Sequence, residues 1–166
     1  MRYSTEIAKK KFGNTPIVAC EIGTFKGDNA LDILKNLNIS KIYLIDAYTK
    51  YDGYEVHSDC DEVESAKSIA HKKLEKYSDK IVWIEDYSAN AVEHIKEQLD
   101  FVYIDGNHTH PYIDDDIKNY YPLVKDGGVF SGHDFSEYWK DVIFAVCNAF
   151  RYKEIKTMNR DWVIIK

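Results

Sequence analysis

The chain has 166 residues, 45% of them hydrophobic, and a formal net charge of −6. This length and apolar content are enough for one domain that buries its own core, and we expect residues 1–166 to form that single domain. The acidic balance argues against a protein that coats nucleic acid, because such proteins present a basic surface. We therefore expect no nucleic-acid partner.

The sequence shows no sign of secretion or of membrane insertion. Cys20, Cys60 and Cys147 are odd in number and far apart, so neither a disulfide framework nor a zinc ribbon is expected. No apolar stretch approaches the roughly 18 residues of a membrane span. The first residues, MRYSTEIAKKKFG, lack the apolar core of a signal peptide. These features predict a cytoplasmic protein without a membrane partner.

Five short apolar runs divide the chain, and an acidic residue or a His-Asp pair follows each of them. The runs and their followers are 17–20 with Glu21, 42–45 with Asp46, 81–84 with Glu85 and Asp86, 101–104 with Asp105, and 128–130 with His133 and Asp134. In an open parallel sheet the carboxyl ends of the strands share one edge, where such folds bind ligands. The sequence therefore predicts that these side chains gather around one crevice.

Segments with helical periodicity separate the runs, which is the pattern of a parallel sheet covered by helices. The predicted helices are 28–37 with Asp28 as N-cap, 62–77, a third that Ser88 caps and that carries Val92, Ile95 and Leu99, 113–120, and 139–150. The tail instead predicts two strands, 154–158 and 162–165, joined by a turn. Residues 48–61 have no clear periodicity and are interpreted as a loop over the site. Trp139 is interpreted as a core anchor.

The loop after the first run, residues 21–27, has its glycines in a GxxxG spacing. A dinucleotide-binding loop needs GxGxxG, which lets the backbone approach a pyrophosphate at a helix N-terminus. Glu21 would repel a pyrophosphate but suits a ligand that carries positive charge, such as a sulfonium or an ammonium group. S-adenosylmethionine carries both.

Asp46 and Asp86 follow the second and third runs. Asp46 stands where a carboxylate can accept both hydroxyls of a ribose. Asp86 can accept from an adenine amino group, with Tyr87 beside it for stacking. Each of these acids could instead begin a helix, a position that Asp and Glu favour whatever the ligand. Both interpretations stay open at this point.

Four segments carry a resemblance to a known family: E-I-G-T-F-K-G, L-I-D-A-Y, F-V-Y-I-D-G-N-H and G-G-V-F-S-G-H-D-F. Together they resemble the class I S-adenosylmethionine-dependent methyltransferases, over about residues 17–135. The chain looks most like the small group related to macrolide-sugar (macrocin-type) O-methyltransferases and cephalosporin-hydroxylase-like methyltransferases. The resemblance implies an α/β fold with a Rossmann-like, doubly wound, seven-stranded sheet. That sheet is mostly parallel with an antiparallel C-terminal hairpin strand, and helices cover both faces.

The resemblance also implies the activity and the cofactor contacts. It implies an S-adenosylmethionine-dependent methyltransferase that methylates an oxygen of a small hydroxylated or sugar-containing acceptor. The expected cofactor-binding residues are Glu21, Gly23, Thr24, Phe25, Gly27, Asp46, Ala47, Asp86, Tyr87 and Asp105. The sequence departs from its relatives at His110, where tyrosine is more usual, and at Pro111 and Tyr112, on the acceptor side.

Asp105, His133 and Asp134 are the candidate metal ligands, because residues at neighbouring strand ends can converge on one divalent cation such as Mg²⁺. A chelated acceptor hydroxyl would have its pKa lowered and its oxygen aimed at the methyl group. Without a metal, His108 or His133 would be the general base. We rank Mg²⁺ or no metal above zinc or iron. The third alternative is a hydrogen-bonded loop corner. The predicted catalytic residues are Asp105, His108 and His133.

Two rival functions stay open on sequence alone. One is an NAD-dependent oxidoreductase on a Rossmann-like sheet, against which the glycine spacing counts. The other is a non-catalytic nucleotide-binding module. A chain this short has little room for a cap over the acceptor, which favours a homodimer whose second copy completes the pocket.

Overall fold

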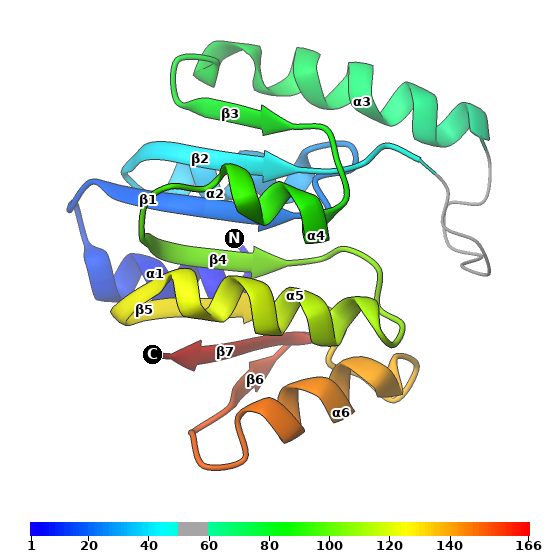
Figure 1. Ribbon diagram of the computed structural model, residues 1–166. Coiled ribbons are helices and arrows are strands. Elements are labelled where there is room, and N and C mark those ends of the chain that lie inside the picture. The colour runs from blue at the N-terminus through cyan, green and yellow to red at the C-terminus, as the bar shows by residue number, and fades with distance from the viewer. Residues whose placement is uncertain (50–59) are drawn as a thin grey trace.

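The computed structural model describes residues 1–49 and 60–166, which form a seven-stranded sheet in the order β3-β2-β1-β4-β5-β7-β6 (Figure 1). The strands are β1 (Ile17–Ile22), β2 (Ile39–Ile45), β3 (Ile81–Ile84), β4 (Leu99–Ile104), β5 (Val124–Gly132), β6 (Lys156–Met158) and β7 (Asp161–Ile165). Strands β1 to β5 are parallel, and β7 runs antiparallel to both β5 and β6. The predicted mostly parallel sheet with an antiparallel C-terminal hairpin is confirmed.

Helices cover both faces of this sheet, as predicted (Figure 1). They are α1 (Tyr3–Phe12), α2 (Asp28–Asn36), α3 (Cys60–Leu74), α4 (Ser88–Ala91), α5 (Tyr112–Tyr120) and α6 (Lys140–Ala149). Helices α1, α2 and α3 pack on one face, and α4, α5 and α6 pack on the other. Within the described residues, no helix has the length and apolarity that crossing a membrane requires.

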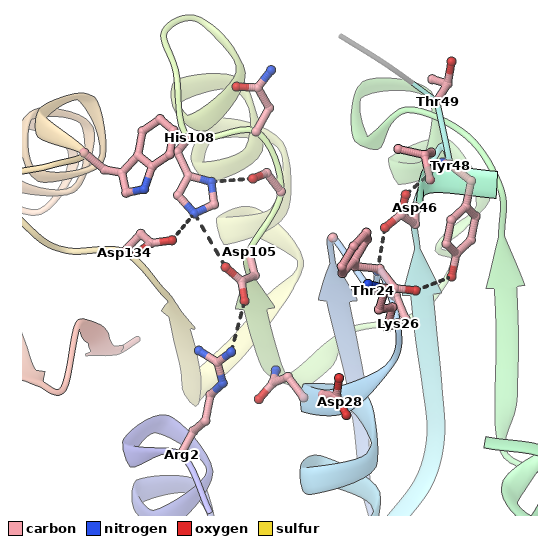
Figure 2. Close-up of a pocket in the computed structure, with 17 residues that line it drawn as sticks. Arg2, Thr24, Lys26, Asp28, Asp46, Tyr48, Thr49, Asp105, His108 and Asp134 are labelled. Carbon is pink, nitrogen blue, oxygen red and sulfur yellow. Dashed lines mark hydrogen bonds and ion pairs between the residues drawn. The ribbon is translucent and has the colours of Figure 1, made fainter. Parts of the chain in front are cut away.

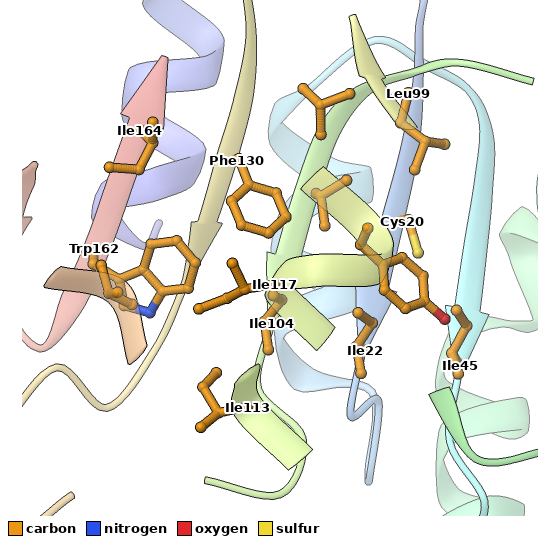
Figure 3. Packing of buried hydrophobic residues seen from close by; sticks show 14 of the residues in the cluster. Cys20, Ile22, Ile45, Leu99, Ile104, Ile113, Ile117, Phe130, Trp162 and Ile164 are labelled. Carbon is orange, nitrogen blue, oxygen red and sulfur yellow. The ribbon is translucent and has the colours of Figure 1, made fainter. Parts of the chain in front are cut away.

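The central strands are mostly apolar because both of their faces are covered. Side chains alternate between the faces, so Val102 of β4 packs on the α4–α6 side and Phe101 on the α1–α3 side. Figure 3 shows the first of these clusters, in which Ile117 of α5 lies near Phe130 and Trp162. Trp162 is fully buried and joins the antiparallel β7 to the core. The strands are thereby fixed, and so are the loops that leave them.

Helix α1 is the element that the sequence patterns did not predict. Its fully buried residues are Ser4, Thr5 and Ala8, which are small and partly polar, and Tyr3, Ile7 and Phe12 pack partly buried against the same core. The backbone N–H and the hydroxyl of Ser4 donate to Asp161 at 2.9 and 2.7 Å, and the Tyr103 hydroxyl donates to the same carboxylate at 2.9 Å. A buried hydrogen-bond network therefore holds α1 to β4 and β7.

Three details of the predicted helices are wrong. Gly27, not Asp28, is the N-cap of α2, with a φ of 74° that glycine adopts at low cost. Ser88 is the first residue of α4 and not its cap. The third helix ends early, because Ile95 has an extended backbone and Leu99 already begins β4.

The predicted C-terminal hairpin is present, with Asn159 and Arg160 at its turn. Both residues have positive φ values, 52° and 68°, as a two-residue hairpin turn requires. The predicted cover loop, residues 48–61, includes residues 50–59, which lie outside the described part of the chain.

Gly23 allows the loops after β1 and β4 to touch. Its φ is 83°, and a Cβ added there would overlap the carbonyl group of Asp105 and lie 2.7 Å from the backbone nitrogen of Gly106. Only a residue without a side chain fits this approach. Gly13 has a similar φ of 57°, but a Cβ added to Gly13 would meet no atom within 4 Å.

We expect Gly23→Ala to destabilise the protein more than the control Gly13→Ala. Backbone strain should cost each variant about 1–2 kcal/mol, and the overlap at Gly23 should add about 1–3 kcal/mol. Urea denaturation followed by circular dichroism gives both free energies of unfolding. Equal losses in the two variants would show that the contact with Asp105 does not constrain Gly23.

Candidate functional site

The residues that follow four parallel strands stand in one row, because each extends the hydrogen-bond ladder beyond its strand. The backbone N–H of Asp46 donates to Ile84, that of Gly23 to Ile45, that of Asp105 to Ile22 and that of His133 to Ile104, at 3.2, 2.8, 2.7 and 2.9 Å. A cavity of about 330 Å³ opens along this row (Figure 2). Of the predicted site residues, it is lined by Gly23, Thr24, Phe25, Asp46, Asp105, His108 and Asp134.

Asp46 organises one end of the cavity. One oxygen of its carboxylate accepts from the Phe25 N–H at 2.7 Å, and the other accepts from the Tyr48 N–H at 2.8 Å. Phe25 and Tyr48 both have positive φ values, 46° and 45°, which cost energy for residues with side chains. The Tyr48 hydroxyl also donates to the Phe25 carbonyl at 3.2 Å. Asp46 therefore holds two strained loops together, and its orientation is fixed.

Glu21 lies beneath the cavity and does not line it. It is 1% exposed and accepts a hydrogen bond from the Asn29 amide nitrogen at 2.7 Å. Burial raises the pKa of Glu21 to about 8, in spite of the opposing hydrogen bond from Asn29. Asn29 does line the cavity, and its buried amide oxygen has no hydrogen-bond partner among the described residues. Asn29 thus offers an unsatisfied acceptor to the cavity. A cation bound nearby would favour the ionised form of Glu21.

Four predicted cofactor residues lie away from this cavity. Ala47 lines a neighbouring cavity together with Glu85. A Cβ added to Gly27 would meet Ala70 and Leu74 of α3 at 3.1–3.4 Å, so Gly27 allows helix α3 to pack closely. Asp86 accepts from the Tyr87 N–H at 2.7 Å and from the Asn90 side chain at 3.0 Å. Neither Asp86 nor Tyr87 lines the two cavities. The geometry of Asp86 fits a helix start, and its adenine contact stays a prediction.

His108 forms the centre of a charged cluster at the other end of the cavity. Its Nε2 lies 2.6 Å from Asp134 and 3.6 Å from Asp105, and its Nδ1 contacts the Gly106 carbonyl. Burial lowers the pKa of His108, but the hydrogen bonds to Asp105 and Asp134 outweigh it and raise the pKa to about 9. Burial raises the pKa of Asp134, but His108 and His133 together hold it below its usual value. His108 and Asp134 are therefore an imidazolium–carboxylate pair at neutral pH.

The structure shows how the two histidines stand to the predicted carboxylates. An imidazolium cannot accept a proton, so the predicted role of His108 as a general base requires its neutral form. His133 lies 3.3 Å from Asp134 and 3.6 Å from Asp105, but it faces an adjoining cavity with Arg2 and does not line the first. The group whose potential ligand atoms all lie within 4.8 Å of one another is Asp105, His108 and Asp134. This group contains His108, which was not among the predicted metal ligands, and the place of His133 in a metal site stays a prediction.

The predicted site residues do not include several residues that line the cavity, and two of these lie beside the charged cluster. Arg2 enters from the segment before α1, and its guanidinium lies 3.5 Å from Asp105. Nothing in the spacing of the N-terminal residues pointed to this position. Trp139 packs against the core as predicted, but it is half-buried and also lines the cavity, with its ring centroid 4.9 Å from that of His108. Its place shortly after the His133-Asp134 pair was the one available signal.

We expect the His108 imidazole to be doubly protonated at pH 7 in protein treated with a chelator. Its two carboxylate neighbours favour the cation, so ¹H–¹⁵N NMR should show both ring nitrogens protonated and a midpoint at about pH 9. The spectrum of His108→Gln identifies the signals. A neutral ring at pH 7 would contradict the assignment and restore His108 as a candidate base.

Comparisons with known proteins agree with this geometry. The model of a family described as a methyltransferase domain matches residues 20–135. No curated protein matches the chain in sequence. Among solved structures, the chain is similar to the calicheamicin methyltransferase CalS11 (TM-score 0.71, 11% identity, 98% of this chain and 77% of that one). It is also similar to an rRNA methylase from Streptococcus thermophilus (TM-score 0.68, 13% identity, 98% of this chain and 93% of that one). A Streptococcus mutans protein in complex with SAH is similar as well (TM-score 0.65, 12% identity, 99% of this chain and 97% of that one).

Because the family model covers more than half of the chain, the protein belongs to the methyltransferase-domain family and is an S-adenosylmethionine-dependent methyltransferase.

Proposed function

We propose that this methyltransferase acts on a hydroxyl oxygen of a small molecule, with a sugar as the favoured acceptor. The observation that carries the proposal is one cavity that joins the Asp46 end to the cluster of Asp105, His108 and Asp134. A sugar acceptor is supported by the likeness to CalS11, which is described as a TDP-rhamnose 3'-O-methyltransferase. Trp139 beside His108 offers an aromatic surface of the kind that packs against a ring.

The methyl donor is proposed to lie along the row of strand ends. The carboxylate of Asp46, which two backbone N–H groups orient, is the acceptor proposed for the ribose hydroxyls. Gly23 lines the cavity next to Asp105, and the chain of the donor is proposed to pass over it. The unsatisfied amide oxygen of Asn29 and the buried Glu21 favour a donor group that carries protons and positive charge. These observations fit S-adenosylmethionine.

The acceptor is proposed to approach over Asp105, His108 and Asp134. A sulfonium methyl group is already activated, so the protein must mainly hold an oxygen in line, at about 3–3.5 Å, and remove its proton. His108 does not take this proton while it is an imidazolium, and Asp134 is a weak base because its pKa is lowered. Neither side chain therefore accounts for removal of the acceptor proton; if a bound cation lowered the pKa of the hydroxyl, that proton would pass to solvent water.

The three side chains fit a divalent cation. Their potential ligand atoms lie within 4.8 Å of one another, and the contact of His108 Nδ1 with Gly106 is the kind that orients a metal-binding imidazole. A bound cation would lower the pKa of the acceptor hydroxyl and fix its oxygen. Two carboxylates suit Mg²⁺ or Mn²⁺, and the imidazole nitrogen extends the choice to a softer transition metal.

We expect purified protein with S-adenosylmethionine and TDP-rhamnose to form an O-methylated sugar, detected by mass spectrometry. Chelator treatment should abolish turnover and Mg²⁺ or Mn²⁺ should restore it. Asp134→Asn should lower kcat roughly 100-fold, because the loss of one charged ligand or partner typically costs this much. Turnover of an RNA substrate but of no sugar would overturn the acceptor class, and turnover in chelator would overturn the cation.

We expect Asp46→Ala to weaken the binding of S-adenosylhomocysteine roughly 100-fold, since hydrogen bonds to a charged group contribute about 1.5–3 kcal/mol each. Isothermal titration calorimetry measures this, and circular dichroism checks that the variant is folded. Asp86→Ala, measured in parallel, should change the affinity less, because Asp86 does not line the cavity. Unchanged affinity in folded Asp46→Ala would remove the ribose assignment.

A further inference from the structure

Arg2 lines the cavity, and neither the sequence patterns nor the proposed chemistry provides a role for it. It precedes α1, and Figure 2 shows Asp105 lying between Arg2 on one side and His108 on the other. The guanidinium is one-third exposed and lines the same cavity as Gly23 and Asn29. It is therefore accessible to a ligand in that part of the cavity.

The guanidinium of Arg2 is held in place but keeps donors to spare. Among the described residues, its one hydrogen bond is donated from Nη1 to the Tyr103 hydroxyl, at 2.8 Å. Its ion pairs with Asp105 and Asp161 are at 3.5 and 3.7 Å, longer than the roughly 2.7–2.9 Å of a direct charged hydrogen bond. A guanidinium has five N–H donors, so most of its capacity is unused.

The other cations of the cavity wall are committed elsewhere. Lys26 binds Glu62 at 2.8 Å and lies over the ring of Phe25. The imidazolium of His108 is engaged by Asp134 and by the Gly106 carbonyl. Among the described cavity residues, Arg2 is thus the cation on the Gly23 and Asp105 side that has donors left for an anion.

We infer that Arg2 binds the α-carboxylate of the methyl donor. The inference rests on the proposed position of the ribose at Asp46. Strands β2, β1 and β4 are neighbours, so the residues that follow β2 and β4 lie two strand spacings apart, roughly 10 Å. A donor that extends from Asp46 past Gly23 brings its amino acid end to Asp105 and Arg2. The planar guanidinium then pairs with the carboxylate through two hydrogen bonds.

Two features of the structure support this pairing. Arg2 already lies beside a carboxylate, that of Asp105, so its guanidinium is placed where a carboxylate can pair with it. The same guanidinium is positioned by Tyr103, whose hydroxyl donates to Asp161, and Asp161 in turn holds Ser4 of α1. The buried network that holds α1 to the sheet therefore also orients Arg2 into the cavity, which gives this helix a role in donor recognition.

The test compares two ligands that differ in one group: S-adenosylhomocysteine and its decarboxylated analogue, S-adenosyl-3-thiopropylamine. Calorimetric titration of the full chain should show that Arg2→Met weakens the first roughly 30-fold and the second less than about 3-fold. Arg2→Lys should give an intermediate loss of S-adenosylhomocysteine, because a lysine keeps the charge but not the planar pair of donors. The matched control is Arg160→Met, since Arg160 is 65% exposed, lies 3.8 Å from Asp134 and does not line the cavity. It should change neither affinity.

The outcomes separate the inference from the proposed function. If Arg2→Met loses both ligands equally, Arg2 acts only through the fold and the inference is overturned. If the wild type binds the two ligands equally well, the carboxylate makes no productive contact and the inference is again overturned. If the wild type binds neither ligand, the proposed donor site itself fails, whatever the effect of Arg2. A loss confined to S-adenosylhomocysteine supports the inference.

Discussion

The parallel hydrogen-bond ladder determines the site, because it continues one residue beyond the end of each central strand. Asp46, Gly23, Asp105 and His133 are each bonded to the neighbouring strand through their backbone N–H groups. Their spacing is therefore that of the sheet and does not depend on loop conformation. A glycine at position 23 is required because the loops after β1 and β4 are in contact there. The rest of the cavity is built on this row.

Electrostatics divides the row into two ends with different chemistry. At one end a single carboxylate, Asp46, holds two strained loops through backbone N–H groups and keeps its charge exposed to a ligand. At the other end two carboxylates share the charge of His108 and Arg2. In the second arrangement the proton on His108 occupies the position at which a divalent cation is proposed to bind. Binding of the cation and protonation of His108 would therefore exclude each other.

The sequence predicted a mostly parallel seven-stranded sheet, its antiparallel hairpin and the family, and all three are confirmed. The NAD-dependent oxidoreductase and the non-catalytic module are wrong as alternatives, because the family is that of a methyltransferase. Strand-end acids could be predicted because buried strands are continuous apolar runs that end sharply. Helix α1 could not, since Ser4 and Thr5 give no periodic signal and their burial depends on Asp161, far along the chain. Arg2 was missed for the same reason.

The sequence by itself determined which residues follow the strands, and hence that Asp46, Asp105 and Asp134 lie at one edge. Only the tertiary structure decided what each of them faces. It placed both His108 and His133 beside Asp105 and Asp134, turned Trp139 toward the cavity and brought Arg2 to Asp105. Periodicity along a chain reports which face of an element is buried, whereas the partner of a polar side chain depends on residues that are distant in sequence and meet only when the sheet is assembled.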